Sequence, residues 1–266
     1  METYKDQWFK IYQDLKFLGK SYSPRGMKTL EIENYQFTGN PRFRICNFKE
    51  RKLSTKYLVQ ELQWYLSANR NNESIVEASK FWGTIKNDFK PYWNSNYGYY
   101  IFSECQFDYC FDQLSKDKDT RQAVIIINRP EVSMSNSKDK ICTYAISFRI
   151  RDNKLNMSVS MRSNDFILGT QIDYFQFSVI QEMLYVFLKE FTYKDLELGT
   201  YTHKSDSFHI YERHFEQMES IIDNDGITFE EVLTPPIVFE EAKLLKLNQF
   251  NPKYRFSHWC LRQLSN

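Results

Sequence analysis

Several features that would assign this chain of 266 residues to a familiar class are missing. Its five cysteines are an odd number without a C-x-x-C pair, which argues against a disulfide framework or a zinc site. The four histidines form no H-E-x-x-H pattern, and we expect no metal. The eight glycines form neither G-x-G-x-x-G nor a P-loop, so a dinucleotide-binding fold is not expected.

An excess of one charge and long apolar runs are also absent. Lys and Arg total 35 against 34 Asp and Glu, so the net charge is +1 and no strong field would attract nucleic acid. No stretch approaches the ~18 uncharged apolar residues of a membrane span. The first residues lack the basic and then apolar order of a signal peptide. We therefore expect a cytoplasmic protein without a membrane or nucleic-acid partner.

What the chain does have is material for a large core, with 42% hydrophobic and 17% aromatic residues. No repeat or long linker divides it, so we expect one domain over 1–266. Ser54 can cap a helix that ends at Ser67, and residues 174–191 are apolar nearly all round, which is typical of a buried central helix. Further helices are expected at 107–114 and up to about 222, and strands at 29–37, 123–127, 142–150, 155–161 and 198–203. This order predicts an α/β or α+β fold with a mixed sheet.

Four polar clusters lie at positions where folding alone does not require polar residues. They are Glu61 in the capped helix, Cys142 at the start of an apolar strand, the run 162–165 at the end of a strand, and His209-Ile-Tyr211. Each also has an ordinary structural interpretation. Glu61 fits a solvated helix face, and Cys142 fits a small core residue. The run 162–165 fits a surface turn, and His209 with Tyr211 fits a pair of core aromatics. Singly, none of the four decides the function.

In order and spacing, these clusters match one family. The matching runs are Glu61-Leu-Gln-Trp-Tyr65, Asn94-Ser-Asn-Tyr-Gly98, Cys142-Thr143, Arg162-Ser-Asn-Asp165, Gly169-Thr-Gln-Ile-Asp-Tyr174 and His209-Ile-Tyr211. The chain resembles the thymidylate synthase superfamily, and within it most of all the deoxycytidylate hydroxymethylases of T-even phages. The resemblance is strongest over residues 25–220, and residues 223–266 match poorly. It implies a thymidylate synthase-like mixed sheet around a buried central helix, and a homodimer packed through the sheets.

The resemblance implies a one-carbon transferase of nucleotide biosynthesis that uses 5,10-methylenetetrahydrofolate as cosubstrate. Cys142 would be the nucleophile that adds to C6 of a pyrimidine nucleoside monophosphate, because the ring carbon C5 becomes reactive only in that adduct. We expect Arg162 to depress the pKa of the thiol. Tyr97 would orient the base and the water around C5. Glu61 would organise a proton relay and the attacking water.

By the same resemblance, five side chains would hold the nucleotide outside its base. Arg162 and Ser163 would bind the phosphate, and Arg121 would reach it across the dimer interface, because a guanidinium can donate two hydrogen bonds to phosphate oxygens. His209 and Tyr211 match the family's ligands of the ribose 3′-hydroxyl.

Asp173 matches the position that selects the base. The synthases carry Asn there, and its carboxamide complements the N3–H donor and O4 acceptor of uracil. Cytosine offers an N4 amino donor, and its N3 is protonated in the thiol adduct, so two acceptors are needed and a carboxylate supplies them. A mispaired buried group costs about 1–3 kcal/mol. Asp173 could instead cap the following helix. We expect the substrate to be dCMP, with Asp173 also counted among the catalytic residues.

The folate would contact Asp165, which matches the carboxylate facing the pterin, and Trp82, which matches the tryptophan beside the folate methylene. The chain also departs from the synthases. Ile85 stands where they have a second tryptophan, and we hypothesise that the space admits water, which favours hydration over hydride transfer. Gln122 replaces the second arginine of a phosphate-binding pair. Arg25 is one residue out of register, which leaves its role open.

Three alternatives stay open at this point. The chain could be a reductive C5-methylase acting on dCMP, CMP or dUMP, or a hydroxymethylase of CMP. From a different class, it could be a non-catalytic relative that only binds a nucleotide or a partner. Intact Cys142, Glu61, Tyr97 and Asp165 argue against that last alternative.

Overall fold

The computed structural model describes residues 4–86 and 92–265. The α-helices are α1 (Tyr4–Leu18), α2 (Thr55–Leu66), α3 (Ser74–Ala78), α4 (Phe81–Ile85), α5 (Gln106–Lys116), α6 (Pro130–Ser133), α7 (Gln171–Phe191), α8 (Phe215–Asp223), α9 (Phe239–Lys246) and α10 (Arg255–Ser265). The strands are β1 (Lys20–Tyr22), β2 (Thr29–Gly39), β3 (Val124–Ile126), β4 (Thr143–Arg151), β5 (Lys154–Asp165) and β6 (Glu197–Tyr211).

The strands form one six-stranded sheet in the order β1-β2-β6-β5-β4-β3. Neighbours are antiparallel except β5 and β6, which run parallel because α7 connects them as a crossover. The expected mixed sheet, and with it the α+β class, is therefore confirmed.

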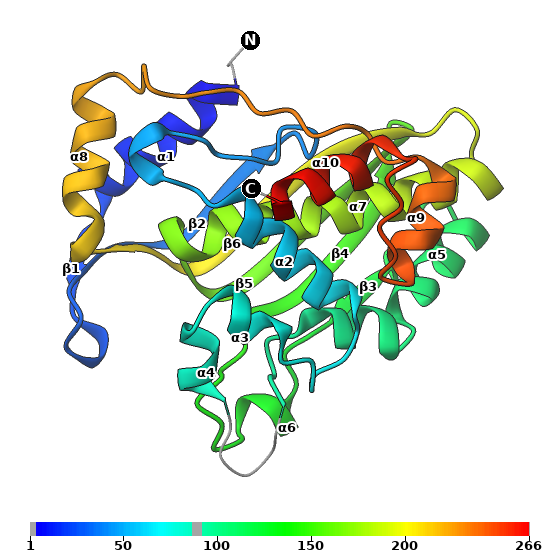
Figure 1. The fold of residues 1–266 in the computed structure, drawn as a ribbon, viewed down its shortest axis with the longest axis horizontal. Helices are drawn as coiled ribbons and strands as arrows, with labels where there is room; N and C mark the ends of the chain where they lie inside the picture. The colour runs from blue at the N-terminus through cyan, green and yellow to red at the C-terminus, as the bar shows by residue number, and fades with distance from the viewer. Residues whose placement is uncertain (1–3, 87–91, 266) are drawn as a thin grey trace.

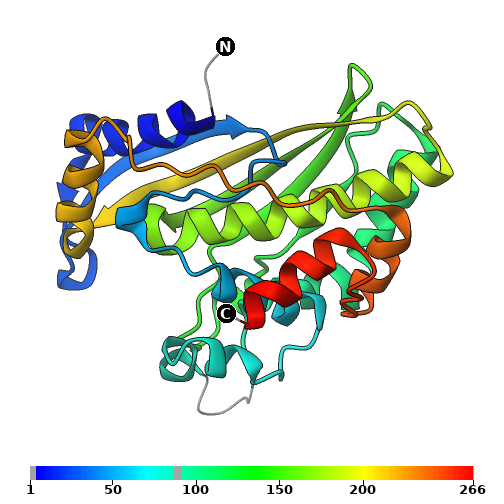
Figure 2. The same cartoon turned by 45° about the horizontal axis from the view of Figure 1, so that its top comes forward.

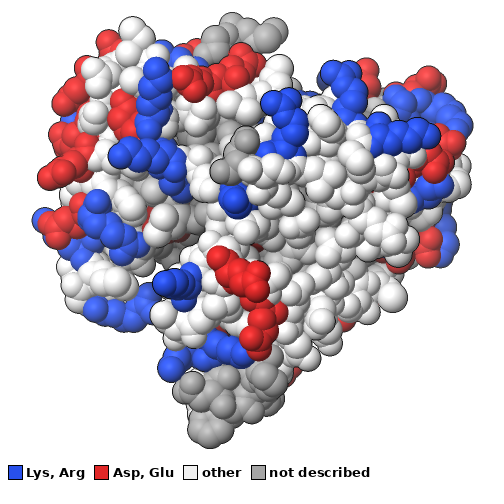
Figure 3. All heavy atoms as spheres, in the orientation of Figure 1, with Lys and Arg blue, Asp and Glu red and all other residues white. Residues whose placement is uncertain are grey.

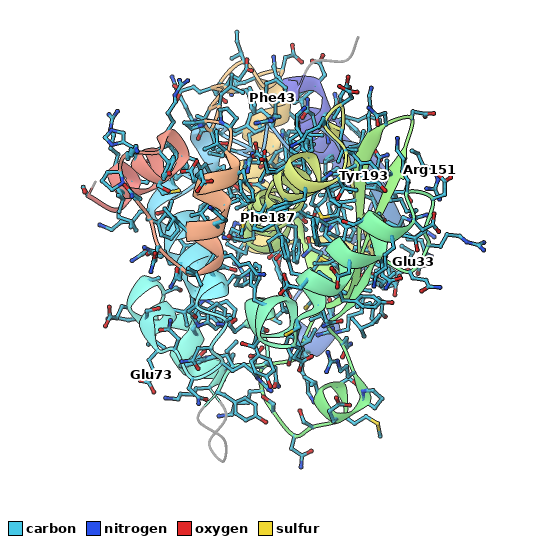
Figure 4. All side chains as sticks on the ribbon, turned by 90° about the vertical axis from the view of Figure 1, so that its right-hand side faces the viewer. Glu33, Phe43, Glu73, Arg151, Phe187 and Tyr193 are labelled. Atoms are coloured by element: carbon cyan, nitrogen blue, oxygen red, sulfur yellow. The ribbon has the colours of Figure 1, made fainter. Side chains whose placement is uncertain are left out.

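The buried helix α7 runs along the middle of the molecule and lies against the sheet (Figures 1 and 2). The amide N–H groups of two interior glutamines are paired: Gln176 donates to the Leu58 carbonyl of α2, and Gln181 donates to a carbonyl of β5. Phe187 points into an aromatic cluster with α5 and α9, whereas Arg151 at the end of β4 points outward (Figure 4). The helix starts at Gln171 rather than at the expected residue 174, and it continues directly from the π-helix η4 (Phe166–Thr170), whose first N–H groups are capped by Asp165.

The central strands are longer than their hydrophobic alternation predicts. The expected strand 155–161 extends to Asp165, and strand 198–203 continues without a break to Tyr211. Polar residues occupy these extensions, so a search for alternating apolar residues misses them. The β4–β5 hairpin is as expected, and Asp152 and Asn153 both take the positive φ of a tight two-residue turn.

The sequence-based elements omit both ends of the chain. Helix α1 packs beside α8, and Trp8 of α1 is fully buried among aromatic rings of β2 and α7. After α8 the chain crosses the molecule alongside α7 to reach α9 and α10 (Figure 2). The buried Glu182 of α7 anchors this crossing segment, because it accepts a hydrogen bond from the backbone N–H of Ile237 at 3.1 Å. The same carboxylate forms ion pairs with Arg42 and Arg44.

Positive and negative side chains are interspersed over the surface seen in Figure 3, in keeping with the nearly neutral net charge. Within residues 4–86 and 92–265, no helix is long and apolar enough to cross a membrane.

We predict that Glu182→Gln destabilises the protein by about 3–5 kcal/mol, because it leaves the fully buried Arg44 guanidinium without its counter-charge. Urea denaturation measures the free energy of unfolding. The control is Glu197→Gln, whose partner Lys154 lies 3.8 Å away at the surface, and it should change this free energy by less than about 1 kcal/mol. Equal effects of the two substitutions would contradict the role of the buried pair.

Candidate active site

Cys142 lies directly before β4, beside a break in the β4–β5 ladder at residues 143–145. Such irregularities re-aim side chains next to active sites. The Cys142 carbonyl accepts a hydrogen bond from the backbone N–H of Arg162 at 2.8 Å, which ties it to β5. Its own backbone N–H donates to the hydroxyl of Tyr97 at 3.3 Å. The structure thus brings together the expected nucleophile and the expected base-orienting tyrosine.

Tyr97 is held by a polar loop that is buried without belonging to a helix or strand. Asn96 donates to the carbonyl of Trp64, and Ser95 donates through its backbone and side chain to Asp139, three residues before Cys142. A Cβ on Gly98 would lie 1.6 Å from the Tyr65 carbonyl oxygen, so only glycine allows this approach to α2. The loop therefore fixes Tyr97 relative to both the nucleophile and α2.

Helix α2 presents an acidic group between two hydroxyls on its buried face. Ser54 caps the helix as expected by accepting from the Tyr57 N–H at 3.2 Å. Tyr57, Glu61 and Tyr65 follow one another at i, i+4 and i+8, which stacks them on one face. Glu61 is only 4% exposed, so the alternative of a solvated helix face is wrong. Burial, and then the charge of Asp173, raise the pKa of Glu61 to about 8, while the two tyrosine hydroxyls lower it.

Asp173 lies in the first turn of α7 but does not cap it. Its Oδ2 accepts a hydrogen bond from the Asn164 side-chain amide at 2.8 Å, and Asn164 is held in turn by the Thr170 hydroxyl. Gly169 makes room for this amide, since a Cβ there would lie 2.9 Å from Asn164 Nδ2. Burial raises the pKa of Asp173 to about 7. Sequence reasoning placed Asn164 in a matching run but gave it no role.

The thiol of Cys142 lies within the electric field of this cluster. Burial raises the pKa of the thiol most, and the charges of Asp173 and Asp139 raise it further. Arg162 acts in the expected direction and lowers the pKa, as does Arg25, whose role the sequence left open. Arg162 thus lowers the pKa of the thiol as expected, but that pKa is raised overall, because desolvation exceeds the effect of the cation.

Arg162 itself is partly engaged by the backbone. Its Nε donates to the Ile141 carbonyl at 2.8 Å, and its Nη2 donates to the Lys140 carbonyl at 3.2 Å. These two residues directly precede the nucleophile. The guanidinium therefore braces the turn that carries Cys142 and also supplies positive charge next to it.

The other expected nucleotide ligands gather at the carboxyl ends of β5 and β6. In the register of these parallel strands, Ser163 pairs with Ser207 and Asp165 pairs with His209. His209 is 7% exposed, and its ring contacts that of Tyr211 edge to face at 5.1 Å. The carboxyl ends of strands are where open sheets of this kind bind ligands.

Arg121 is the one expected ligand that lies far from the other site residues within a single chain. It precedes β3, and the antiparallel register that pairs Val124 with Ser147 places it beside the far end of β4. Eight residues of strand, roughly 25 Å, separate that end from Cys142. Arg121 is exposed there. It joins the other residues only if a second subunit brings it.

The two expected folate ligands border the cluster and keep accessible surface, which fits contact with a ligand. Asp165 Oδ1 accepts from the N–H groups of Ile167 and Leu168, so the residue also caps η4. The indole N–H of Trp82 donates to the Tyr57 hydroxyl at 2.8 Å, next to the Glu61 side of the site. Ile85 ends the short helix α4 that carries Trp82.

Across the described ranges of the chain, no three His, Cys, Asp or Glu side chains come together as a potential metal site. The groups that do meet are a thiol, two carboxyls of raised pKa and several hydroxyls. Perturbed carboxyls beside a nucleophile are typical of an acid–base active site.

Comparison with known proteins shows which family this chain is similar to. The family model described as Thymidylate synthase matches residues 3–252. The deoxycytidylate 5-hydroxymethyltransferase of Enterobacteria phage T4 is 32% identical over 199 residues, 71% of this chain and 78% of the relative. The deoxyuridylate hydroxymethyltransferase of Bacillus phage SP01 is 31% identical over 209 residues, 73% of this chain and 53% of the relative. A thymidylate synthase of Bacillus atrophaeus is 24% identical over 199 residues, 71% of this chain and 84% of the relative.

The family match spans most of the chain and extends past both ends of the region where the motifs lie. The thiol, carboxyls and tyrosines of the cluster come from the matched runs. On these grounds, the chain belongs to the thymidylate synthase family.

Proposed function

We propose that this chain is a folate-dependent hydroxymethylase that converts dCMP to 5-hydroxymethyl-dCMP. One observation carries the proposal: the buried carboxyl of Asp173, in the position where the synthases carry Asn, lies close enough to the Cys142 thiol for its charge to raise the pKa of that thiol. Relatives named for hydroxymethyl transfer, at 31–32% identity, support transfer of a hydroxymethyl group rather than a methyl group.

The proposed chemistry begins with a bond between the Cys142 sulfur and C6, which sends the ring's electron pair to C5. The cosubstrate 5,10-methylenetetrahydrofolate supplies the methylene carbon, and Trp82 and Asp165 would contact it. C5 bonds to that carbon, and the first folate C–N bond opens. Loss of the C5 proton then drives cleavage of the remaining C–N bond, so that tetrahydrofolate leaves with the electron pair and an exocyclic C5=CH2 double bond remains. Water oxygen adds to it, Glu61 takes the water proton, the C5–C6 double bond re-forms, and the sulfur leaves C6 with its electron pair.

Asp173 supports cytosine as the base. The Asn164 amide takes one lone pair of Oδ2, so Oδ1 and the second lone pair of Oδ2 are left to accept from the two donors of the base. Two neighbouring donors of the cytosine adduct also favour the ionised carboxylate, against the burial that raises its pKa. A uracil O4 facing this carboxylate would set acceptor against acceptor.

We further propose that the active unit is a homodimer with the phosphate bound between subunits. Arg121 lies at the wrong end of β4 to reach the site of its own chain. The helices around α7 lie on one side of the sheet, and exposed side chains such as Tyr144, Lys204 and Asp206 point away from the core. A partner packed on that second side would carry its own Arg121 toward Arg162 and Ser163.

The experiment for the reaction is incubation with dCMP, CMP or dUMP, each with methylenetetrahydrofolate, followed by mass spectrometry. We expect 5-hydroxymethyl-dCMP from dCMP, and no product with Cys142→Ala. The same variant should lose the covalent complex with 5-fluoro-dCMP and folate that the unaltered protein forms. A product of 5-methyl-dCMP would establish reductive methylation instead. If Cys142→Ala lost the covalent complex but still formed product, the complex would report on binding and not on the reaction.

The substitution Asp173→Asn should shift preference toward dUMP, because an amide offers uracil both the donor and the acceptor it needs. We expect the ratio of kcat/KM for dCMP over dUMP to fall by about one to two decades. Competition assays with both nucleotides present measure this ratio. An unchanged ratio would mean that Asp173 does not recognise the base.

The raised pKa of Glu61 also predicts a loss of stability with rising pH. In the unfolded chain the carboxyl ionises near 4.5, while in the folded chain it stays protonated to about 8. The free energy of unfolding therefore falls as the pH rises through this interval, by about 5 kcal/mol from this group. Glu61→Gln lacks this loss.

Thermal unfolding between pH 5 and pH 9 measures the effect. Glu61→Gln should match the unaltered protein near pH 5 and exceed its Tm at pH 9. The exposed Glu216→Gln is the control and should follow the unaltered protein at every pH. Parallel curves for Glu61→Gln would show that this carboxyl ionises normally in the fold.

A further inference from the structure

Tyr57 lies outside every family motif, yet its hydroxyl contacts two residues of the site. It stands one turn before Glu61 on the buried face of α2. The indole N–H of Trp82 donates to its oxygen at 2.8 Å. Its hydroxyl also hydrogen-bonds the Glu61 carboxyl. Because the oxygen already accepts from the indole, the phenolic proton is free to point to Glu61.

The indole that makes this contact is itself held firmly. Its ring packs against Trp64 with centroids 4.9 Å apart, and the Trp82 carbonyl accepts from the Trp93 indole at 2.9 Å. Trp64 belongs to the same helix as Tyr57. Trp64 and Trp93 thus hold the Trp82 indole N–H in position over the Tyr57 hydroxyl. Packing alone does not require the hydroxyl of a half-buried tyrosine to be oriented in this way.

We propose that Tyr57 is a positioning residue of this site: its hydroxyl, oriented by the Trp82 indole, holds the ionised carboxylate of Glu61 toward the reacting carbon. The proposal rests on the hydroxymethylase function, in which Glu61 takes the proton of the attacking water. It also connects the folate side of the pocket, where Trp82 lies, to the acid–base group through a single hydroxyl.

The direction of the effect follows from the groups that face Glu61. From α7, the negative charge of Asp173 disfavours ionisation, and from α2 itself, Tyr57 and Tyr65 favour it by donating hydrogen bonds. Tyr97, from the polar segment that precedes η3 (Tyr99–Ser103), faces Tyr65 and Asp173 and contributes no positive charge. The hydroxyls are therefore the groups that keep the ionised form accessible near neutral pH.

Tyr57→Phe tests this, with Trp82→Phe as a second variant that keeps Tyr57 and removes only the indole donor. The matched control is Tyr100→Phe, since the buried Tyr100 hydroxyl has no hydrogen-bond partner within the described part of the chain. The first readout needs no substrate: carbon-13 NMR of the Glu side-chain carboxyls is followed from pH 5 to pH 10, and the Glu61 signal is assigned by its loss in Glu61→Gln.

We expect the Glu61 titration to move upward by roughly one pH unit in Tyr57→Phe, by less in Trp82→Phe, and not at all in Tyr100→Phe. The acid limb of kcat/KM for hydroxymethylation should move with it, while the covalent complex with 5-fluoro-dCMP still forms. An unmoved titration in Tyr57→Phe, or an equal shift in Tyr100→Phe, overturns the proposal. If Tyr57→Phe does not fold, an unmoved titration in Trp82→Phe overturns it.

The same experiments distinguish failure of the role proposed for Tyr57 from failure of the proposed function on which it rests. If the unaltered protein forms no covalent complex and no hydroxymethylated product, the proposed function fails whatever Glu61 does. If product forms normally and the titration of Glu61 is indifferent to Tyr57, the function stands and the role of Tyr57 falls.

Discussion

The site depends on two buried carboxyls, those of Glu61 and Asp173, and on the partly buried thiol of Cys142, with Asp173 acting electrostatically on the other two. Burial raises the pKa values of all three groups, and the charge of Asp173 raises those of Glu61 and Cys142 further, so an ionised Asp173 opposes ionisation of the other two. A neutral Asp173 removes one of the charges that oppose the thiolate. The cation Arg162 and the donors Asn164 and Tyr57 then decide which group ionises. Substrate donors that stabilise Asp173 would change that balance, so nucleotide binding and acid–base state are linked in this arrangement.

The scaffold serves this cluster by bringing groups from distant parts of the chain to one end of the sheet. Helix α2 supplies Glu61 and the hydroxyls beside it, the loop around Tyr97 supplies a further hydroxyl, and α7 supplies the carboxyl of Asp173. Gly98 and Gly169 are needed where two of these pieces approach each other most closely. A single long helix against a mixed sheet keeps the pieces in register.

Much of this could be predicted from the sequence. The capped helix, the hairpin and the buried helix each have a local signature, and the ordered motifs predicted the family. The pKa of Cys142 could not be predicted, because it depends on the sum of burial and charges from four segments. Tyr57 and Asn164 were missed for the same reason: their partners, Trp82 and Asp173, are identified only by the fold. Both ends of the chain were missed because α1, α9 and α10 lack motifs and are stabilised by tertiary packing.

The contacts that anchor the C-terminal segment affect the position of α7 as well as the stability of the fold. Glu182, which binds Arg42 and Arg44 and the crossing chain at Ile237, lies on the same helix as Asp173, nine residues or about 13 Å further along. A buried helix clamped at mid-length transmits axial displacement instead of absorbing it. Slippage of α7 by one residue's rise, about 1.5 Å, would take Asp173 out of hydrogen-bonding range of a base. In the proposed function, discrimination between two pyrimidines would then depend in part on the segment at Ile237 that anchors this helix.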